Sequence, residues 1–150
     1  MEIERKFLIP FLPENIDEYP VLLLEQAYVC RQPVLRVRRE EQGDMSKFIL
    51  TYKSEGLMVR EEYNFPLSEE SYYHLKAKAE GRVITKKRYR IPEKDGLTIE
   101  LDVFEGELTG LVMAEVEFSD EASAQQYTPP DWFGKEVTSD PEYHNSNLSL

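Results

Sequence analysis

Charged side chains recur at every second position in several segments of this chain, and this alternation limits the folds open to it. Side chains two residues apart lie on the same face of a β-strand. Arg36 and Arg38 therefore share one face, with Val37 on the other. Glu115 and Glu117 share a face in the same way. Each of these segments predicts a strand with one charged face and one apolar face.

The full pattern predicts a β-rich α+β fold of about eight strands, because turn signals separate the alternating segments. The strands are expected at residues 2–9, 27–30, 34–41, 46–53, 58–65, 83–91, 97–105 and 112–119. Helices are expected at residues 13–19, 68–80 and 120–127. Ser68 is expected to cap the second helix and Gly81 to stop it. With 150 residues, 41% of them hydrophobic, the chain is long enough for one core, so residues 1–150 are expected to form a single domain.

The paired charges are also sorted by sign, with acidic pairs on some strands and basic pairs on others. A sheet face that meets only water would mix the signs, because like charges on neighbouring strands repel each other. For any one strand, a solvated face of an antiparallel sheet remains a sufficient explanation. Together, the sorted pairs favour a closed eight-stranded antiparallel β-barrel, with the charged faces lining the lumen and a few helices packed outside.

Such a lumen would hold many acidic and basic side chains close together. Its acidic residues would be Glu2, Glu4, Glu62, Glu100, Asp102, Glu115 and Glu117. Its basic residues would be Lys6, Arg36, Arg38, Lys53, Lys86 and Arg88. Buried charges are costly unless they are paired, so this lumen favours a ligand that carries both signs. A short polyphosphate with divalent cations fits, because carboxylates bind Mg²⁺ or Mn²⁺ and basic side chains bind phosphate oxygens.

Charge and cysteine content narrow the class of protein. The net charge of −11 at pH 7 disfavours extended binding to nucleic acid or to an anionic membrane. No apolar stretch approaches the roughly 20 residues that a membrane-spanning helix needs. The single cysteine, Cys30, cannot form an internal disulfide, and the chain enters a charged segment at Glu2 without a signal peptide. These features predict a cytoplasmic protein.

The first residues, Glu2-Ile3-Glu4-Arg5-Lys6, resemble the E-x-E-x-K signature of the CYTH, or triphosphate tunnel metalloenzyme, superfamily. Later segments follow in the family's order: Arg36-Val37-Arg38, Thr51-Tyr52-Lys53, Arg60 to Glu62, Lys86-Lys87-Arg88, Glu100-Leu101-Asp102, Glu115-Val116-Glu117 and Glu136-Val137-Thr138. The segment at residues 131–138 is similar to that of the short bacterial inorganic triphosphatases. The resemblance covers the whole chain, and it implies an eight-stranded antiparallel tunnel that binds triphosphate.

The resemblance also implies roles for the residues of the lumen. Two ions, Mg²⁺ or Mn²⁺, would be held by Glu2, Glu4, Asp102, Glu115 and Glu117, with Glu62 as a neighbouring residue of the metal site. The phosphates would be bound by Lys6, Arg36, Arg38, Lys53, Lys86 and Arg88. Lys6 and Tyr28 would form a catalytic pair. For each of these residues, a structural role in an ion pair or in packing remains the alternative.

The activity that the resemblance implies is hydrolysis of inorganic triphosphate to diphosphate and phosphate. The family also contains class IV adenylyl cyclases, which convert ATP to cyclic AMP, and thiamine triphosphatases, so these activities remain alternatives. A module that binds polyphosphate or a nucleotide without turnover is a third. A homodimer is compatible with the sequence.

Three further residues are expected to serve the fold rather than the chemistry. His74 and His144 are expected at the surface or in packing, since this hydrolysis requires no histidine base. Trp132 is expected to pack the C-terminal segment against the end of the barrel.

Overall fold

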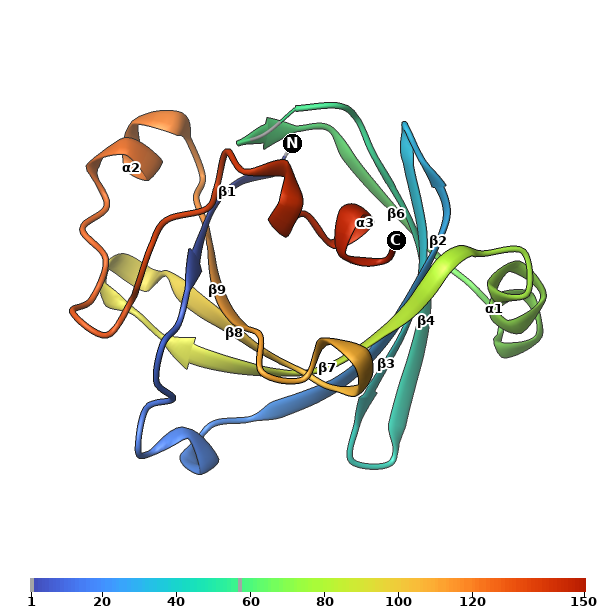
Figure 1. The fold of residues 1–150 in the computed structure, drawn as a ribbon, viewed down its shortest axis with the longest axis horizontal. Helices are drawn as coiled ribbons and strands as arrows, with labels where there is room; N and C mark the ends of the chain where they lie inside the picture. Colours follow the sequence, from blue (N-terminus) through green and yellow to red (C-terminus); the bar gives the residue numbers. More distant parts are fainter. Residues whose placement is uncertain (1, 57) are drawn as a thin grey trace.

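The computed structural model describes residues 2–56 and 58–150, and its strands form one antiparallel sheet that curls into a barrel (Figure 1). Its nine strands are β1 (Glu2–Leu8), β2 (Val21–Arg31), β3 (Val34–Gln42), β4 (Met45–Lys53), β5 (Val59–Arg60), β6 (Glu62–Pro66), β7 (Glu80–Pro92), β8 (Thr98–Phe104) and β9 (Val112–Glu117). Their order in the sheet is β5-β1-β9-β8-β7-β2-β3-β4-β6. The predicted β-rich antiparallel fold is confirmed.

The barrel is nearly closed through β5 and β6, the two strands at the ends of this order. They follow each other in the chain with only Glu61 between them. β5 pairs with β1, where Arg60 is the partner of Glu2, and β6 pairs with β4. The sequence predicted one strand at residues 58–65 and hence eight strands in all. The structure has nine, because this segment breaks at Glu61 to pair with two different neighbours.

Two other elements differ from their predicted limits. β2 begins at Val21 rather than at residue 27. The prediction missed these residues because the first four, Val-Leu-Leu-Leu, are all apolar and show no alternation. Residues 13–19 form only a short 3₁₀ turn, Ile16–Glu18, in place of the predicted helix. A helix was expected there from polar and apolar spacing alone, which does not distinguish one helical turn from two.

The predicted helix at residues 68–80 is α1 (Glu69–Lys76), and Ser68 caps it by accepting a hydrogen bond from the Ser71 N–H. Gly81 does not stop this helix, because it lies inside β7. Its φ of 72° and the close carbonyl oxygen of Ser149 leave no room for a side chain. The third predicted helix is α2 (Glu121–Gln126). None of the helices in the described residues is long and apolar enough to span a bilayer.

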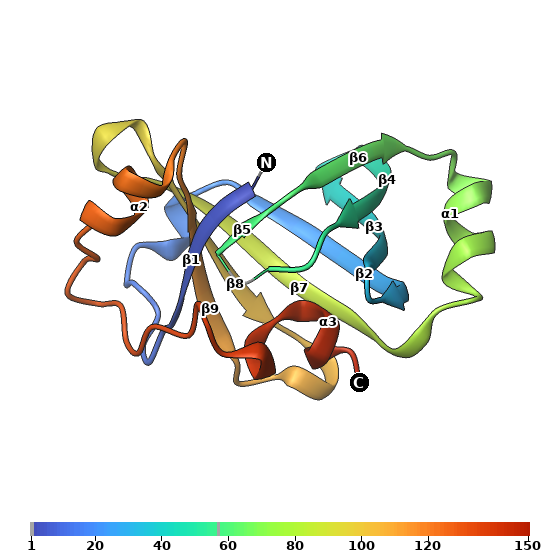
Figure 2. The same ribbon diagram turned by 90° about the horizontal axis from the view of Figure 1, so that it is seen from above.

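Two apolar clusters cover the outside of the barrel. The larger cluster lies over β1, β7, β8 and β9, and its buried members are Ile3, Phe7, Ile9, Ile16, Ile91, Ile99, Leu101, Ala114, Val116, Phe118, Ala124 and Tyr127. Trp132 packs against this cluster, which confirms its predicted role. The smaller cluster, Ala27, Val37 and Tyr72, lies between α1 and the strands beneath it. α1 and α2 lie at opposite ends of the molecule, both outside the barrel (Figure 2).

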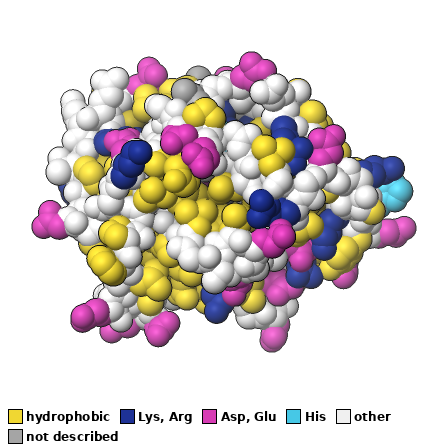
Figure 3. Space-filling view, viewed as in Figure 1, with side chains coloured by type: hydrophobic (Ala, Val, Ile, Leu, Met, Phe, Trp, Pro, Cys, Tyr) yellow, Lys and Arg dark blue, Asp and Glu magenta, His cyan; other side chains and the backbone are white. Residues whose placement is uncertain are grey.

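A third cluster lies inside the barrel, and we call it the inner apolar cluster. It consists of Tyr28, Val34, Ile84, Phe104 and Met113, with partly buried Leu8, Leu108, Leu111, Tyr143 and Leu148 packed against it. These last two residues belong to the C-terminal tail, which ends in α3 (Asn145–Leu148). Figures 1 and 2 show α3 across one mouth of the barrel, and Figure 3 shows hydrophobic side chains gathered at the centre of that face. The prediction that a few helices pack outside the barrel is confirmed for α1 and α2, whereas α3 covers a mouth of the barrel, because the strands present apolar side chains inward at this end.

Candidate active site

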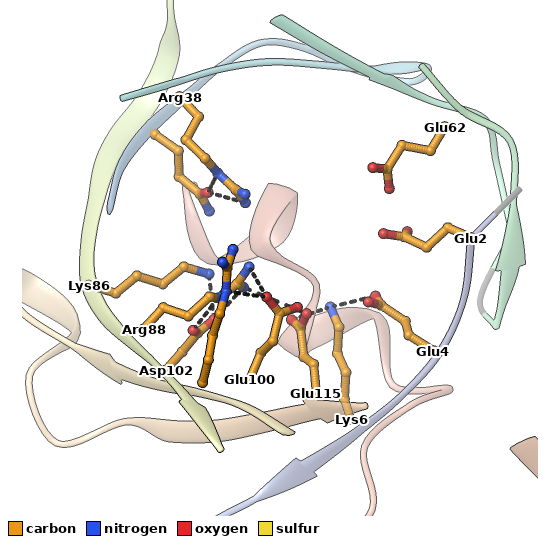
Figure 4. A network of polar contacts seen from close by, with 12 residues as sticks. Glu2, Glu4, Lys6, Arg38, Glu62, Lys86, Arg88, Glu100, Asp102 and Glu115 are labelled. Atoms are coloured by element: carbon orange, nitrogen blue, oxygen red, sulfur yellow. Dashed lines mark hydrogen bonds and ion pairs between the residues drawn. The ribbon is translucent and has the colours of Figure 1, made fainter. Parts of the chain in front are cut away.

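A cavity of about 240 Å³ lies inside the barrel, beside the inner apolar cluster. The predicted site residues that line it are Glu2, Glu4, Lys6, Tyr28, Arg36, Arg38, Lys53, Glu62, Arg88, Glu115 and Glu117, together with Glu100. Figure 4 shows acidic side chains such as Glu2 and Glu4 on one side of this space and Arg38 on the other. The structure thus brings together most of the residues that the alternation assigned to the lumen.

One wall of the cavity is acidic and is built mainly by the neighbouring strands β1 and β9. In their register Glu4 is the partner of Glu117, and Lys6 is the partner of Glu115. The Nζ atom of Lys6 lies 3.9 Å from a carboxylate oxygen of Glu4 and 3.8 Å from one of Glu115. Arg60 lies 3.7 Å from Glu4 and Arg88 lies 3.7 Å from Glu115, so basic side chains contact both of these carboxylates. Glu117 has no ion pair among the described residues, so at its end this wall keeps negative charge.

Crowding of carboxylates changes their protonation. The pKa of Glu2 is raised from 4.5 to about 8 by burial, by a hydrogen bond with Glu62 and by the charge of Glu4. The pKa of Glu62 is lowered to about 2, because the hydrogen bond from Glu2 and the charge of Lys53 outweigh burial. Burial and neighbouring carboxylates also raise the pKa of Glu117. Near neutral pH these shifts favour a protonated Glu2 beside an ionised Glu62.

Lys86 and Asp102 lie beneath the cavity wall and do not line the cavity. The Asp102 carboxylate is fully buried and accepts hydrogen bonds from Nε and Nη2 of Arg88 at 2.7 and 2.9 Å. The Nζ atom of Lys86 lies 2.7 Å from the same carboxylate. Burial lowers the pKa of Lys86 to about 8, although the charge of Asp102 opposes this. Both oxygens of the predicted metal ligand Asp102 thus contact basic side chains.

The opposite wall carries basic residues on β3, and they are poorly neutralised. The Arg36 side chain is 5% exposed, and no carboxylate in residues 2–56 or 58–150 lies within ion-pair distance of it. Its Nε atom is buried without a hydrogen-bond partner. Burial and the charges of Arg36 and Arg88 lower the pKa of Arg38 to about 10. A buried cation without a counter-charge is costly, so this wall is suited to an anion that arrives from outside.

Lys6 and Tyr28, the predicted catalytic pair, line the same cavity from different strands. Tyr28 is 2% exposed and is the partner of Arg36 in the register of β2 and β3. The described residues contain no hydrogen bond between Lys6 and Tyr28. Tyr28 also belongs to the inner apolar cluster, so it lies at the boundary between the apolar and charged parts of the interior.

The sequence analysis missed several residues of the cavity, and three of them lie in the C-terminal tail. His144, Asn145 and Ser146 line it, although His144 was expected in packing or at the surface. Burial and the charges of Lys6 and Arg60 lower the pKa of His144 to about 4. The alternation of charges does not mark this tail, because the tail reaches the cavity only through the tertiary fold. Arg60 also lines the cavity, and its position two residues before Glu62 was a usable signal.

The donor atoms of the acidic wall fit a divalent cation, although they do not form a finished site. Among the described residues, no group of three or more Asp, Glu, His or Cys side chains is arranged to hold a metal ion. The wall nevertheless presents hard carboxylate oxygens from Glu2, Glu4, Glu115 and Glu117. Burial and neighbouring carboxylates raise the pKa of Glu2, Glu4 and Glu117, so a bound cation would stabilise the ionised form of these side chains.

Comparisons with known proteins identify close relatives. The chain is 40% identical to an inorganic triphosphatase of Nitrosomonas europaea across 99% of this chain and 97% of that protein. It is 38% identical to an inorganic triphosphatase of Acetivibrio thermocellus across 98% of this chain and 92% of that protein. No protein-family model matches the chain.

Solved structures of triphosphatases share the fold of this chain. A crystal structure of an inorganic triphosphatase is 39% identical, matches all of this chain and 95% of that one, and superposes with a TM-score of 0.70. A Hippeastrum protein described as having a dominant triphosphatase activity is 16% identical over 83% of each chain, with a TM-score of 0.64, and shares the fold. From the sequence relatives and the shared tunnel fold, the chain belongs to the CYTH, or triphosphate tunnel, superfamily, in the family of the bacterial inorganic triphosphatases.

Proposed function

We propose that this chain hydrolyses inorganic triphosphate to diphosphate and phosphate in the cavity of the barrel. The observation that carries the proposal is Arg36, a buried cation that lines the cavity without a carboxylate partner in the described chain. A phosphate chain would supply the missing negative charge. The names of the relatives, inorganic triphosphatases at 38–40% identity over nearly the whole chain, support the same activity.

The acidic wall is proposed to hold the divalent metal ions, two Mg²⁺ or Mn²⁺. Glu2, Glu4, Glu115 and Glu117 would be their ligands, with Glu62 beside them. When bound, these ions would neutralise the phosphate oxygens and activate the attacking water. Asp102 is proposed to keep Arg88 and Lys86 in place rather than to bind an ion, because its oxygens contact these two side chains.

The basic wall is proposed to bind the phosphate chain. Arg36, Arg38 and Arg88 line the cavity and can donate several hydrogen bonds each to phosphate oxygens. Lys53 lies 3.0 Å from Glu2 and 3.6 Å from Glu62, so it would bind phosphate oxygens beside the acidic wall. Lys6 and Tyr28 are proposed to donate hydrogen bonds to the reacting phosphate group, which needs stabilisation as its bridging P–O bond breaks.

The chemistry of the lining favours an inorganic substrate over ATP or thiamine triphosphate. An organic group needs an apolar or aromatic surface beside the phosphate site. Apart from Tyr28, Val34 and Ile49, the residues lining the cavity are charged or polar. Lining of this kind suits a ligand that consists of phosphate alone.

The deciding experiment is a measurement of phosphate release from the purified protein. Inorganic triphosphate, ATP and thiamine triphosphate would be compared in Mg²⁺, in Mn²⁺ and in EDTA. We expect turnover of inorganic triphosphate that requires a metal and falls about 100-fold or more in Glu4→Gln. Glu121→Gln, the same change at an exposed position on α2, is the matched control and should keep full activity.

Other products would change the assignment. Cyclic AMP from ATP would make the protein a cyclase. Binding of triphosphate without turnover in either metal would make it a binding module.

A further inference from the structure

Arg38, one of the basic residues of the cavity, is held by a side chain that carries no charge. Gln26 is its partner in the register of β2 and β3, and this glutamine is fully buried. The Oε1 atom of Gln26 accepts hydrogen bonds from Nε of Arg38 at 3.1 Å and from Nη2 at 2.9 Å. Arg38 lines the cavity and Gln26 does not, so Gln26 can influence a ligand only through Arg38.

A second arginine of the cavity is held in the same manner but by an acid. Nε and Nη2 of Arg88 donate to the carboxylate of Asp102, at 2.7 and 2.9 Å. The same pair of guanidinium nitrogens is therefore occupied in both arginines. The difference lies in charge, because Asp102 neutralises Arg88 whereas Gln26 leaves the charge of Arg38 in place.

The surroundings of Arg38 restore the charge balance only in part, because Glu40 supplies one carboxylate beside two arginines. Among the described residues its nearest carboxylate is that of Glu40, 3.5 Å from Nη1. Arg36, on the same face of β3, has no carboxylate partner. This part of the cavity wall therefore keeps positive charge, while hydrogen bonds from Arg38 to Gln26 fix the direction of its guanidinium.

We propose that Gln26 is a positioning residue, which orients Arg38 toward the phosphate chain without neutralising it. The inference rests on the proposed function, since it concerns how the same cavity binds triphosphate. Two of the five N–H donors of Arg38 point to Gln26, and Nη1, which is paired with Glu40 at 3.5 Å, makes no hydrogen bond among the described residues and could donate to phosphate oxygens. A glutamate at this position would hold the guanidinium equally well but would reduce its attraction for an anion.

Two substitutions separate orientation from charge. Gln26→Glu keeps the shape and the acceptor but adds a negative charge, and Gln26→Met keeps the neutrality but removes the acceptor. We expect Gln26→Glu to raise KM for triphosphate about tenfold while kcat changes less than about threefold, because the lost attraction affects bound substrate and transition state alike. We expect Gln26→Met to raise KM less, about threefold. Gln126→Glu, at an exposed position on α2, is the matched control and should leave both constants unchanged.

Thermal stability distinguishes positioning from a merely structural role. Gln26→Glu should melt at or above the wild-type temperature, because the introduced carboxylate and Arg38 would form an ion pair like that of Asp102 and Arg88. A lower affinity in a protein of equal stability would support the proposal. The affinity itself would be measured by calorimetric titration with triphosphate in EDTA, where no hydrolysis is expected.

Arg38→Met supplies the final control, because Gln26 should act only through Arg38. In the Arg38→Met background, Gln26→Glu should change triphosphate affinity less than threefold. A tenfold loss that persists in this background, or a wild-type KM in Gln26→Glu, would overturn the inference and leave the proposed function standing. Failure of the wild-type protein to bind or hydrolyse triphosphate would overturn both.

Discussion

The two parts of the barrel interior are built on the same strands and have opposite character. On β3 the inward residues run from Val34 to Arg36 and Arg38, and on β7 they run from Ile84 to Lys86 and Arg88. The apolar part is closed by the C-terminal tail, and the charged part forms the cavity. The two parts therefore serve different purposes. Apolar packing at one end of the barrel stabilises the fold, and the charged side chains further along the barrel axis can bind a ligand.

Substitutions in the apolar part should lower the free energy of unfolding without changing substrate binding. Phe104→Ala removes a ring that is 2% exposed in the inner apolar cluster, and should lower the free energy of unfolding by about 3–5 kcal/mol. Urea unfolding followed by circular dichroism would measure this. KM for triphosphate, measured on the folded variant, should stay within about twofold of the wild-type value.

Phe104→Leu is the milder comparison at the same site, and it should lose less stability because it leaves a smaller cavity. A normal free energy of unfolding together with a large rise in KM would show that the two parts are not independent. That result would contradict the division of tasks.

Substitutions in the charged part should lower activity without lowering the free energy of unfolding. Arg36→Met replaces an unpartnered buried cation by an apolar side chain of similar length, so we expect kcat/KM for triphosphate to fall about 100-fold, equal to about 2.7 kcal/mol. The free energy of unfolding should stay equal or rise by about 1 kcal/mol, because the cost of burying the charge disappears. Enzyme assays and urea unfolding on the same preparation would test both parts.

Arg39→Met is the matched control, since Arg39 lies on the same strand but outside the cavity, paired with Glu41 at 3.4 Å. It should keep normal kcat/KM. A destabilised Arg36→Met variant with normal activity would mean that Arg36 serves the fold.

Protonation offers a finer comparison, because burial, a hydrogen bond with Glu62 and the charge of Glu4 raise the pKa of Glu2 from 4.5 to about 8. Between these pH values the folded protein keeps a proton that the unfolded chain has released, so stability falls as pH rises through this window. The pKa of Glu4 and that of Glu117 are also raised, and they act in the same direction. His144, with its pKa lowered to about 4, opposes this trend only below pH 6.5.

We therefore expect the wild-type protein, in EDTA and without triphosphate, to melt at a lower temperature at pH 8 than at pH 6.5. Glu2→Gln should reduce this difference by about 3 °C, because the side chain no longer loses a proton. Glu121→Gln, on the surface, should retain the wild-type difference. Equal pH dependence in wild type and Glu2→Gln would show that Glu2 is ionised throughout the window.

The sequence alone predicted which side chains face inward, but not their level along the barrel axis. Alternation assigns a face, and it correctly grouped Glu115 with Glu117 and Arg36 with Arg38. The level depends on how each strand is offset against its neighbours, which a single strand does not encode. This is why Asp102 lies under the wall, paired with Lys86 and Arg88, while Glu100 from the same strand lines the cavity.

The position of the C-terminal tail at the barrel mouth could not be predicted from alternation, for a related reason. Its residues carry no alternating charge, and they reach the barrel mouth because Tyr143 and Leu148 pack on the inner apolar cluster. Arg31 helps to hold the tail by donating to the Ser146 carbonyl at 3.0 Å. Contacts of this kind join residues more than 100 positions apart, and no local pattern reports them.

Substitutions in the C-terminal tail should have the smallest effect on KM. They also compare the two parts of the interior directly, because the tail contacts both. Asn145 lines the cavity, is 9% exposed, and has an Oδ1 atom that is buried without a hydrogen-bond partner. Asn145→Ala should raise KM for triphosphate about threefold and leave the melting temperature unchanged or slightly higher, because an unpaired buried acceptor is removed. Asn147→Ala, two residues on, removes a hydrogen bond of 2.6 Å to the Pro141 carbonyl outside this cavity, and should lower the melting temperature while KM stays normal. If Asn145→Ala instead melted early and kept its KM, the tail would belong wholly to the apolar part, and the charged cavity would consist of strand residues alone.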